Sequence, residues 1–228
     1  MCSSLSVHTQ THTHTQQGNI HSDIGGMVYT PILSVRDVEI LKRWFELASF
    51  LDPVLRSHPS NGQDHVPQPW SSSMIETTKK FSQIHVALKS YKQSLLSTLA
   101  KTGLPPVRHT LMCCDVESVT NEAFESLSES QLMLGTDLLI APVLKASQKT
   151  IPSILLPPVC SNSCNDDDQH QQEESWYNIW KGHEKVYESG TTLINFDAPL
   201  GFPAVFVRSG SSVAKELSKI IMKMKSHS

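Results

Sequence analysis

Apolar residues recur at helical spacing in the first half of the chain. The segment DVEILKRWFELASFL, from Asp37 to Leu51, gathers its apolar residues on one face, and Asp37 stands where an N-cap is expected. A second stripe predicts one long helix from about Ser73 to Ala100, ended by Gly103. The apolar positions of this second stripe are Phe81, Ile84, Leu88, Tyr91, Leu95 and Leu99.

The segment between these two helices, PVLRSH, is apolar at its start and charged at its end. We expect a buried strand here whose last residues emerge at a surface. The following residues are rich in Pro, Gly and Asn and predict a loop. Alternating loop-strand, helix, strand and helix is typical of βα units, so the first half is predicted to be α/β.

After Leu104 the pattern changes to short apolar runs separated by Gly, Pro, Asn and Asp, which predicts an all-β half. The runs are PPVRHTLM, QLMLGTDLLIAPVL, SILLPPV, SWYNIW, TTLINF and PAVFVRSG. An acidic polar insert at 160–175 interrupts them. The tail VAKELSKIIMKMK predicts a short basic amphipathic helix, either packed on the domain, which we favour, or touching a membrane surface.

Composition narrows the class of protein. The chain has 228 residues and a net charge of −3, which does not favour a nucleic-acid partner. No segment approaches the ~20 apolar residues that span a bilayer. Five cysteines at scattered positions fit reduced thiols, and no signal peptide is visible. The expected location is the cytoplasm, or at least one that is not demonstrably secreted, and otherwise it is left open. No oligomeric state is predicted.

Two stretches could hold a metal ion. The tract HTQTHTHTQQ at 8–17 could be a histidine site, but no carboxylate or Cys completes a ligand set nearby, so we favour a disordered end. Cys160 and Cys164 could bind a metal with His170, but we favour a plain loop. No metal and no cofactor are therefore expected.

Several blocks together resemble glycoside hydrolase family 31, the α-glucosidase-like retaining enzymes, and most closely its sulfoquinovosidase-like branch. In chain order the blocks are HSDIGG, ILKRWFELASF, RSH, GLPPVRH, QLMLGTDLLIAPVL, WYNIWKG and FDAPLGFPAVFVRSGS. They cover the chain from Ile20 to Ser211. One block would be a weak signal, whereas the ordered set at family-like spacing is a strong one.

The resemblance implies a (β/α)8 barrel followed by a β-sandwich, with HSDIGG at the end of barrel strand seven and PVLRSH at strand eight. The expected fold class is thus α/β followed by all-β, with only the last βα units of the barrel present. The implied divisions are a low-complexity N-terminus at 1–18, the barrel part at 19–102, the β-sandwich at 104–213 with its insert at 160–175, and the tail at 214–228.

The resemblance also implies three substrate-binding residues, because barrel active sites lie at the carboxyl ends of the strands. Asp23 would accept, and His58 would donate, hydrogen bonds with sugar hydroxyls that strengthen as the ring flattens in the transition state. Arg56 would orient that wall through its planar fork. The plain alternatives are a turn-forming Asp23 and surface polar residues. We favour the binding role for Asp23 and His58 and leave both open for Arg56.

A retaining glycosidase needs a nucleophile and an acid/base carboxylate about 5–5.5 Å apart. The resemblance places both upstream of HSDIGG, so we expect this chain to lack them. Asp37 and Asp52 lie in helical or pre-proline contexts without a motif. The expected function is a fragment of a retaining hydrolase acting on O-glycosyl bonds of α-glucosides or sulfoquinovosides, inactive alone. RSHPSN lacks the acidic residue common after the His, which leaves the substrate open.

A non-catalytic carbohydrate-binding or interaction fragment is the alternative function. Trp176, Tyr177 and Trp180 could stack on a sugar face, or they could pack the core of the β domain, which we favour.

Overall fold

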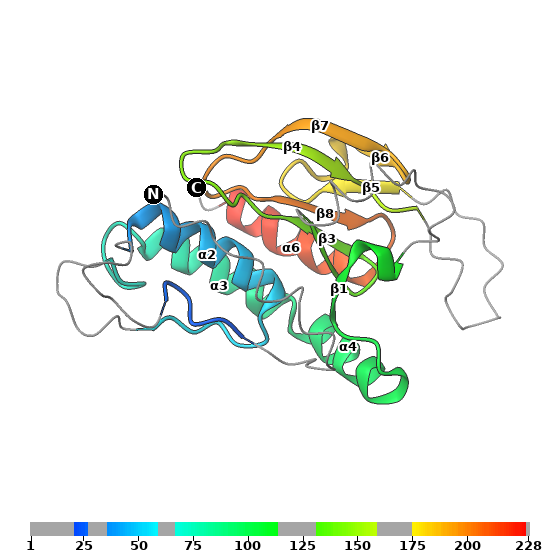
Figure 1. Ribbon diagram of the computed structural model, residues 1–228, viewed down its shortest axis with the longest axis horizontal. Helices are drawn as coiled ribbons and strands as arrows, with labels where there is room; N and C mark the ends of the chain where they lie inside the picture. Colours follow the sequence, from blue (N-terminus) through cyan, green and yellow to red (C-terminus); the bar gives the residue numbers. More distant parts are fainter. Residues whose placement is uncertain (1–20, 27–35, 59–66, 114–130, 159–174, 227–228) are drawn as a thin grey trace. The chain divides into compact units, whose positions relative to one another are not determined.

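The computed structural model divides the chain into two compact units (Figure 1). It describes residues 21–26, 36–58, 67–113, 131–158 and 175–226. Unit 1 consists of Met1–Pro106, Pro142–Thr150 and Ala198–Pro203, and unit 2 consists of Val107–Ala141, Ile151–Asp197 and Ala204–Ser228. Two stretches from the C-terminal half of the chain therefore belong to the first unit.

The described part of unit 1 is mainly helical. Its helices are α2 Val38–Leu51, α3 Ile75–Ala87 and α4 Lys89–Thr102, and α2 and α3 pack side by side (Figure 1). The prediction for α2 is confirmed, including its N-cap: the Asp37 carboxylate accepts a hydrogen bond from the Ile40 N–H at 2.7 Å. The buried cluster beneath α2 comprises Ile24, Leu41, Phe45, Ala48 and Met74.

The long helix predicted from Ser73 to Ala100 is two helices, so that prediction is wrong at one point. α3 ends at Ala87 and α4 begins at Lys89, with Leu88 between them at φ −81° and ψ −4°. Leu88 is fully buried and continues the apolar stripe across the break, and no Gly or Pro marks it. The predicted end is confirmed, because Gly103 closes α4 at φ 78°.

A buried ion pair on α2 holds the two later stretches of unit 1. Arg43 and Glu46 lie 2.8 Å apart, with both side chains almost fully buried. Arg43 also donates to the carbonyls of Gln148 and Ala198, each at 3.0 Å. Glu46 accepts from the Gly201 N–H at 2.5 Å. Burial raises the pKa of Glu46, and the charge of Arg43 opposes that shift.

The strand predicted at PVLRSH is reduced to one bridge. Ser57 pairs with Ile24 in a parallel bridge, and the flanking residues 52–56 and 58 are not in strand conformation. Among the described residues the ladder has no further rung here. The complete barrel strand expected at this position is therefore not seen, although the parallel direction of the pair agrees with a βαβ unit formed around α2.

The second half of the chain forms two sheets, as predicted. A six-stranded sheet has the order β1-β2-β3-β8-β5-β6, and β4 pairs with β7 in a two-stranded sheet. All five pairings of the six-stranded sheet are antiparallel, which fits a β-sandwich. The strands are β1 Val107–His109, β2 Leu132–Leu134, β3 Leu138–Ala141, β4 Thr150–Leu155, β5 Ser175–Asn178, β6 Val186–Glu188, β7 Thr192–Asp197 and β8 Ala204–Arg208.

The strands at the centre of the six-stranded sheet are buried throughout, whereas the edges are not. Every residue of β3 and β8 is buried, which explains why their apolar runs were easy to recognise. β6 was not among the predicted runs. It has only three residues, and it exposes Val186 and Glu188 on either side of Tyr187, so it offers too short an apolar signal.

The tail forms helix α6, Ser212–Lys225, which lies along β8 (Figure 1). Its apolar face is buried within unit 2 through Val213, Ala214, Leu217 and Ile221. The Tyr177 hydroxyl donates to the Ala214 carbonyl at 3.3 Å. The interpretation as a packed terminal helix is therefore confirmed.

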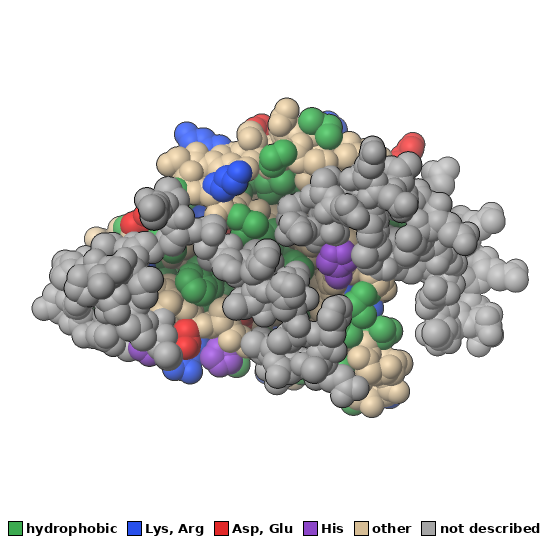
Figure 2. Space-filling model, viewed as in Figure 1, with side chains coloured by type: hydrophobic (Ala, Val, Ile, Leu, Met, Phe, Trp, Pro, Cys, Tyr) green, Lys and Arg blue, Asp and Glu red, His purple; other side chains and the backbone are tan. Residues whose placement is uncertain are grey.

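None of the helices in the described ranges combines the length and the apolar character that crossing a bilayer requires. On the face drawn in Figure 2, the described acidic and basic side chains are interspersed rather than gathered by sign.

Candidate functional site

Two short segments of unit 1 run parallel and bring the three predicted site residues to one face. The Ile24 N–H donates to the Arg56 carbonyl at 3.0 Å, and the His58 N–H donates to the Ile24 carbonyl at 3.3 Å. Ile24 is fully buried, and side chains alternate between the faces of an extended segment. Asp23 therefore shares the opposite face with Arg56 and His58.

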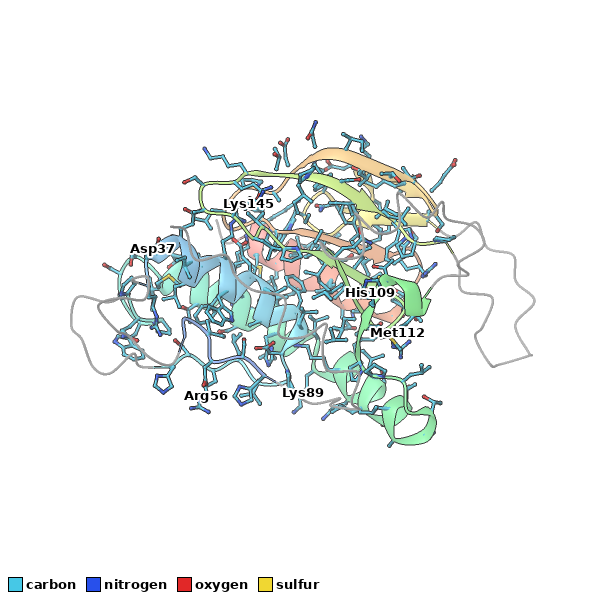
Figure 3. The ribbon with its side chains drawn as sticks, viewed as in Figure 1. Asp37, Arg56, Lys89, His109, Met112 and Lys145 are labelled. Atoms are coloured by element: carbon cyan, nitrogen blue, oxygen red, sulfur yellow. The ribbon has the colours of Figure 1, made fainter. Side chains whose placement is uncertain are left out.

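Asp23 presents an unused acceptor on this face. Its Oδ1 atom is buried and has no hydrogen-bond partner among the described residues. The Arg56 guanidinium forms an ion pair with it, because Nη2 lies 3.7 Å from Oδ1, beyond hydrogen-bond distance. Arg56 is 54% exposed and points away from the helices (Figure 3). The carboxylate is thus charge-paired but keeps a lone pair for a donor.

The peptide before Asp23 is fixed by Asp52. The N–H and the hydroxyl of Ser22 both donate to Asp52 Oδ2, at 2.9 and 2.6 Å. The Trp44 indole N–H donates to the same hydroxyl at 2.9 Å. Asp52 is 4% exposed, and burial raises its pKa while the Ser22 bonds oppose the shift. A carboxylate so enclosed is structural, and Asp37 is likewise occupied as a helix cap.

Lys92 offsets the charge at this end of α2. Its ammonium donates to the carbonyls of Ser49 and Asp52 at 3.0 and 2.7 Å, where the helix C-terminus favours a cation. It also lies 3.2 Å from His85 Nδ1. Burial lowers the pKa of Lys92 to about 7, although Asp52 acts in the opposite direction.

Arg36, which sequence reasoning missed, holds the other side of Asp23. Its guanidinium is buried. Nε donates to the Gly25 carbonyl at 2.9 Å, and Nη2 donates to the carbonyls of Gly26 and His58 at 3.2 and 2.7 Å. Nη1 donates to the Pro67 carbonyl at 3.3 Å and to the Gln68 side-chain carbonyl at 3.5 Å, which is the fifth acceptor. An arginine just before an N-cap has the pattern of a surface residue, so the sequence carried no signal.

The place of the Arg36 guanidinium requires a residue without a Cβ atom at position 25. Gly25 has φ +89°, and a Cβ atom there would lie 2.5 Å from Arg36 Nε. A glycine after a polar residue often marks a close approach of the backbone to another group. In the structure, the close approach at Gly25 is made by Arg36.

Two of the three aromatic residues that could stack on a sugar in the alternative, carbohydrate-binding function are not available for stacking. Trp176 is fully buried, and its indole N–H donates to the Pro157 carbonyl at 3.1 Å. Tyr177 is 1% exposed. Both pack the core, as favoured above. Trp180 is only partly buried.

The predicted metal ligands fall outside the described residues. This holds for the tract at 8–17 and for Cys160, Cys164 and His170. Within the described ranges, no group of three or more His, Cys, Asp or Glu side chains is placed to hold a metal ion.

Comparison with known proteins places these features in a family. Residues 103–213 match the model described as "Glycosyl hydrolase family 31 C-terminal domain". The chain is 34% identical over 194 residues to the sulfoquinovosidase of Agrobacterium fabrum (strain C58), covering 84% of this chain and 25% of that protein. The chain belongs to glycoside hydrolase family 31.

Other family members give the same result. The sulfoquinovosidase of Escherichia coli (strain K12) is 28% identical over 202 residues, covering 88% of this chain and 26% of that protein. A solved family 31 sulfoquinovosidase from E. rectale, in complex with the aza-sugar inhibitor IFGSQ, superposes with a TM-score of 0.68 at 26% identity, covering 91% of this chain and 27% of that one. The chain thus spans about a quarter of the length of the relatives it matches.

Proposed function

We propose that this chain forms part of a retaining family 31 glycosidase that acts on O-glycosyl bonds of α-glucosides or sulfoquinovosides. Asp23, His58 and Arg56 would line one wall of its sugar pocket. The observation that carries the proposal is the buried Oδ1 of Asp23, which has no hydrogen-bond partner among the described residues and lies on the face it shares with His58. A buried acceptor without a donor is costly, and a sugar hydroxyl would satisfy it.

The roles follow from the chemistry of the side chains. The Asp23 carboxylate accepts a hydrogen bond from a sugar hydroxyl, and the His58 imidazole donates one. Such bonds tighten as the ring approaches an oxocarbenium-like transition state, so they lower the barrier as well as bind the ground state. Arg56, whose Nη2 lies 3.7 Å from Asp23 Oδ1, would help to orient that carboxylate through its planar fork.

The divisions of the chain are part of the same proposal. Residues 19–102 would contribute the last βα units of a (β/α)8 barrel. The parallel bridge of Ile24 and Ser57 around α2 supports this, because parallel pairs joined by a helix are the unit of that fold. Residues 104–213 would be the β-sandwich with its insert at 160–175. The segment 1–18 would precede the barrel part, and the tail 214–228 would follow the β-sandwich.

The 228 residues alone would not turn over a glycoside. The retaining reaction needs two carboxylates about 5–5.5 Å apart, and the resemblance assigns neither role to a carboxylate of this chain. Asp23 is assigned to binding, and Asp52 is enclosed by Ser22 and Trp44. The test is release of nitrophenol from an aryl α-glycoside by the purified protein, and measurable release would contradict this part of the proposal.

Sugar binding is tested by NMR titration of the ¹⁵N-labelled 228-residue protein with methyl α-glucoside and, separately, methyl α-sulfoquinovoside. The amide signals of Asp23 to Gly26 and of His58 are expected to shift. Asp23→Asn and His58→Ala should each weaken binding about 10-fold, the value of one charge-assisted hydrogen bond.

The matched controls are Asp197→Asn and His183→Ala, which replace exposed residues of unit 2. They should leave the affinity unchanged. Shifts confined to unit 2, or an Asp23→Asn variant with undiminished affinity, would overturn the assignment of the sugar wall. The tighter of the two ligands identifies the substrate branch.

A further inference from the structure

We infer that Arg36 is a positioning residue that sets the spacing between Asp23 and His58 by bridging the ends of the two segments that carry them. Its consequence for sugar binding rests on the function proposed above. The geometry of the bridge itself stands on the hydrogen bonds of the described residues.

The bridge occupies the place of a missing ladder rung. In a parallel pair, the two bonds that flank Ile24 would be followed by one from the Gly26 N–H to the His58 carbonyl. Instead, the Gly26 N–H turns back to the Asp23 carbonyl at 2.8 Å. The Arg36 Nη2 group donates to the carbonyls of both Gly26 and His58. A side chain thus joins the two segments where the backbone stops doing so.

Only arginine has the donors for this arrangement. Five N–H groups in one plane reach five acceptors, all of them neutral carbonyl oxygens of main chain or side-chain amide. Lysine offers three donors around a single point and cannot span them. Burial lowers the pKa of Arg36. The cost of burying this cation is offset by the hydrogen bonds that fix the site.

The position of the arginine is itself specified by the sequence. Gly25 leaves the space that the guanidinium fills, since a Cβ would meet its Nε, Cζ and Nη2 atoms at 2.5–2.7 Å. Gly26 also has a positive φ, +84°, but a Cβ there meets nothing within 4 Å among the residues that the structure describes. Both positions therefore require a left-handed backbone, but only Gly25 must also leave space for Arg36. Substitutions at the two positions can distinguish these two requirements.

This pair of glycines supplies the first test, amide hydrogen exchange at Ile24 and His58 in the 228-residue protein. Gly25→Ala and Gly26→Ala both incur the strain of a positive φ, but only Gly25→Ala displaces the guanidinium. Exchange at both amides should be at least about 5-fold faster in Gly25→Ala than in Gly26→Ala, which is about 1 kcal/mol in the opening equilibrium. Equal exchange in the two variants would overturn the inference.

The second test compares Arg36→Lys with Arg208→Lys. Arg208 is also buried and also donates to a carbonyl, that of Thr136 in unit 2. Arg36→Lys should weaken methyl α-glycoside binding at least 10-fold, since small displacements of binding groups have large effects, whereas Arg208→Lys should stay within about 2-fold. Faster exchange without loss of affinity would make Arg36 merely structural and would overturn the positioning role.

The Nε–H signal of Arg36 provides a spectroscopic readout. It should shift on adding sugar, because the bonded Gly25 carbonyl is two residues from Asp23, while the Nε–H of Arg208 should not. If the wild-type protein binds neither glycoside, the proposed function fails, and the exchange data still decide whether Arg36 holds the two segments. If Arg36→Lys does not fold, the glycine pair decides.

Discussion

In the six-stranded sheet, β3 is hydrogen-bonded along its length to β2 on one side and to β8 on the other. At the candidate site, one parallel bridge joins Ile24 to Ser57, and many of the other hydrogen bonds are made by side chains, among them those of Arg36, Asp52 and Trp44. The hydrogen bonds of a backbone ladder do not require particular side chains, so a substitution in the ladder acts mainly through the burial of its side chain. A site held by side-chain hydrogen bonds depends on each of those side chains.

This difference indicates where a single substitution should lower the free energy of unfolding and where it should displace a neighbouring group. In unit 2 a large buried side chain contributes packing energy shared by the whole sheet. In the parallel pair of unit 1, the side chains of Arg36, Asp52 and Trp44, here called the clamp, each fix the positions of the particular groups to which they are hydrogen-bonded. Three sets of substitutions test this contrast in addition to the experiments above.

The largest effect is expected from Trp176→Ala. The side chain is fully buried in unit 2 and stacks under the Arg208 guanidinium at 4.6 Å. Its removal should cost about 3–5 kcal/mol of unfolding free energy, as large core truncations do. Urea denaturation measures it. Trp70→Ala, at a residue 69% exposed, is the control and should cost less than about 0.5 kcal/mol.

The contrast would break if Trp176→Ala also accelerated amide exchange at Ile24 and His58 under conditions where unit 2 remains folded. The stability of the sheet in unit 2 and the order of the candidate site would then not be independent of each other. Unchanged exchange at those two amides would support their independence.

An intermediate effect is expected from pH, through Lys92. Its pKa is about 7 in the folded protein against 10.5 ordinarily. Between these values the unfolded chain binds the extra proton, so stability should rise with pH, by at most about 1.4 kcal/mol per pH unit. Urea denaturation at pH 7 and pH 9 measures the rise. Lys92→Met should remove this part of it.

A second lysine of unit 1 must be separated from Lys92. Burial lowers the pKa of Lys80 from 10.5 to about 8. The contribution of Lys80 to stability should therefore also rise with pH, but over a narrower pH range than that of Lys92. Solvent screens this more exposed group. Lys80→Met is therefore the matched control. The buried carboxyls Glu46 and Asp52, with raised pKa values, have the opposite sign: their contribution falls as the pH rises above their ordinary values of 4.5 and 3.8. A Lys92→Met variant with the full wild-type rise would contradict the assignment.

The smallest effects are expected at the two helix N-caps, one in each unit. Asp37 accepts from the Ile40 N–H at 2.7 Å, and Ser211 accepts from the Ala214 N–H at 3.2 Å. Asp37→Ala and Ser211→Ala should each cost about 1 kcal/mol, measured by thermal or urea unfolding. The loss at Asp37 should be the larger because its charge also interacts with the helix dipole.

The controls keep an acceptor at each cap. Asp37→Asn and Ser211→Thr should recover most of the stability. If the alanine variants cost nothing, the helices are held by packing alone. Because the same device operates in both units, a loss of stability at both caps would show that the contrast between the units lies in the sheet and the bridge and not in helix capping.

Sequence pattern predicted what repeats along the chain and missed what depends on distant partners. The helix at Val38–Leu51, its cap at Asp37 and the end at Gly103 were predictable because capping and periodicity are local. The buried runs of β3 and β8 were equally legible. The break at Leu88 was not, because the apolar stripe passes through it.

For the candidate site, the ordered blocks led to Asp23, His58 and Arg56, whose binding roles remain predictions. The blocks did not lead to Arg36. Its acceptors come from three separate segments, and nothing in the residues around it distinguishes a clamp from a surface arginine. The same applies to Asp52, whose partner Ser22 lies 30 positions away.

The ion pair on α2 has a consequence for how the chain is made. Arg43 and Glu46 find acceptor and donor at Ala198 and Gly201, each 155 positions later. At 5–20 residues per second, a ribosome needs about 8–30 s to add that stretch. During this interval the charged side chains of Arg43 and Glu46 lack these two partners. Helix α2 can therefore reach its native environment only after Gly201 has been synthesised.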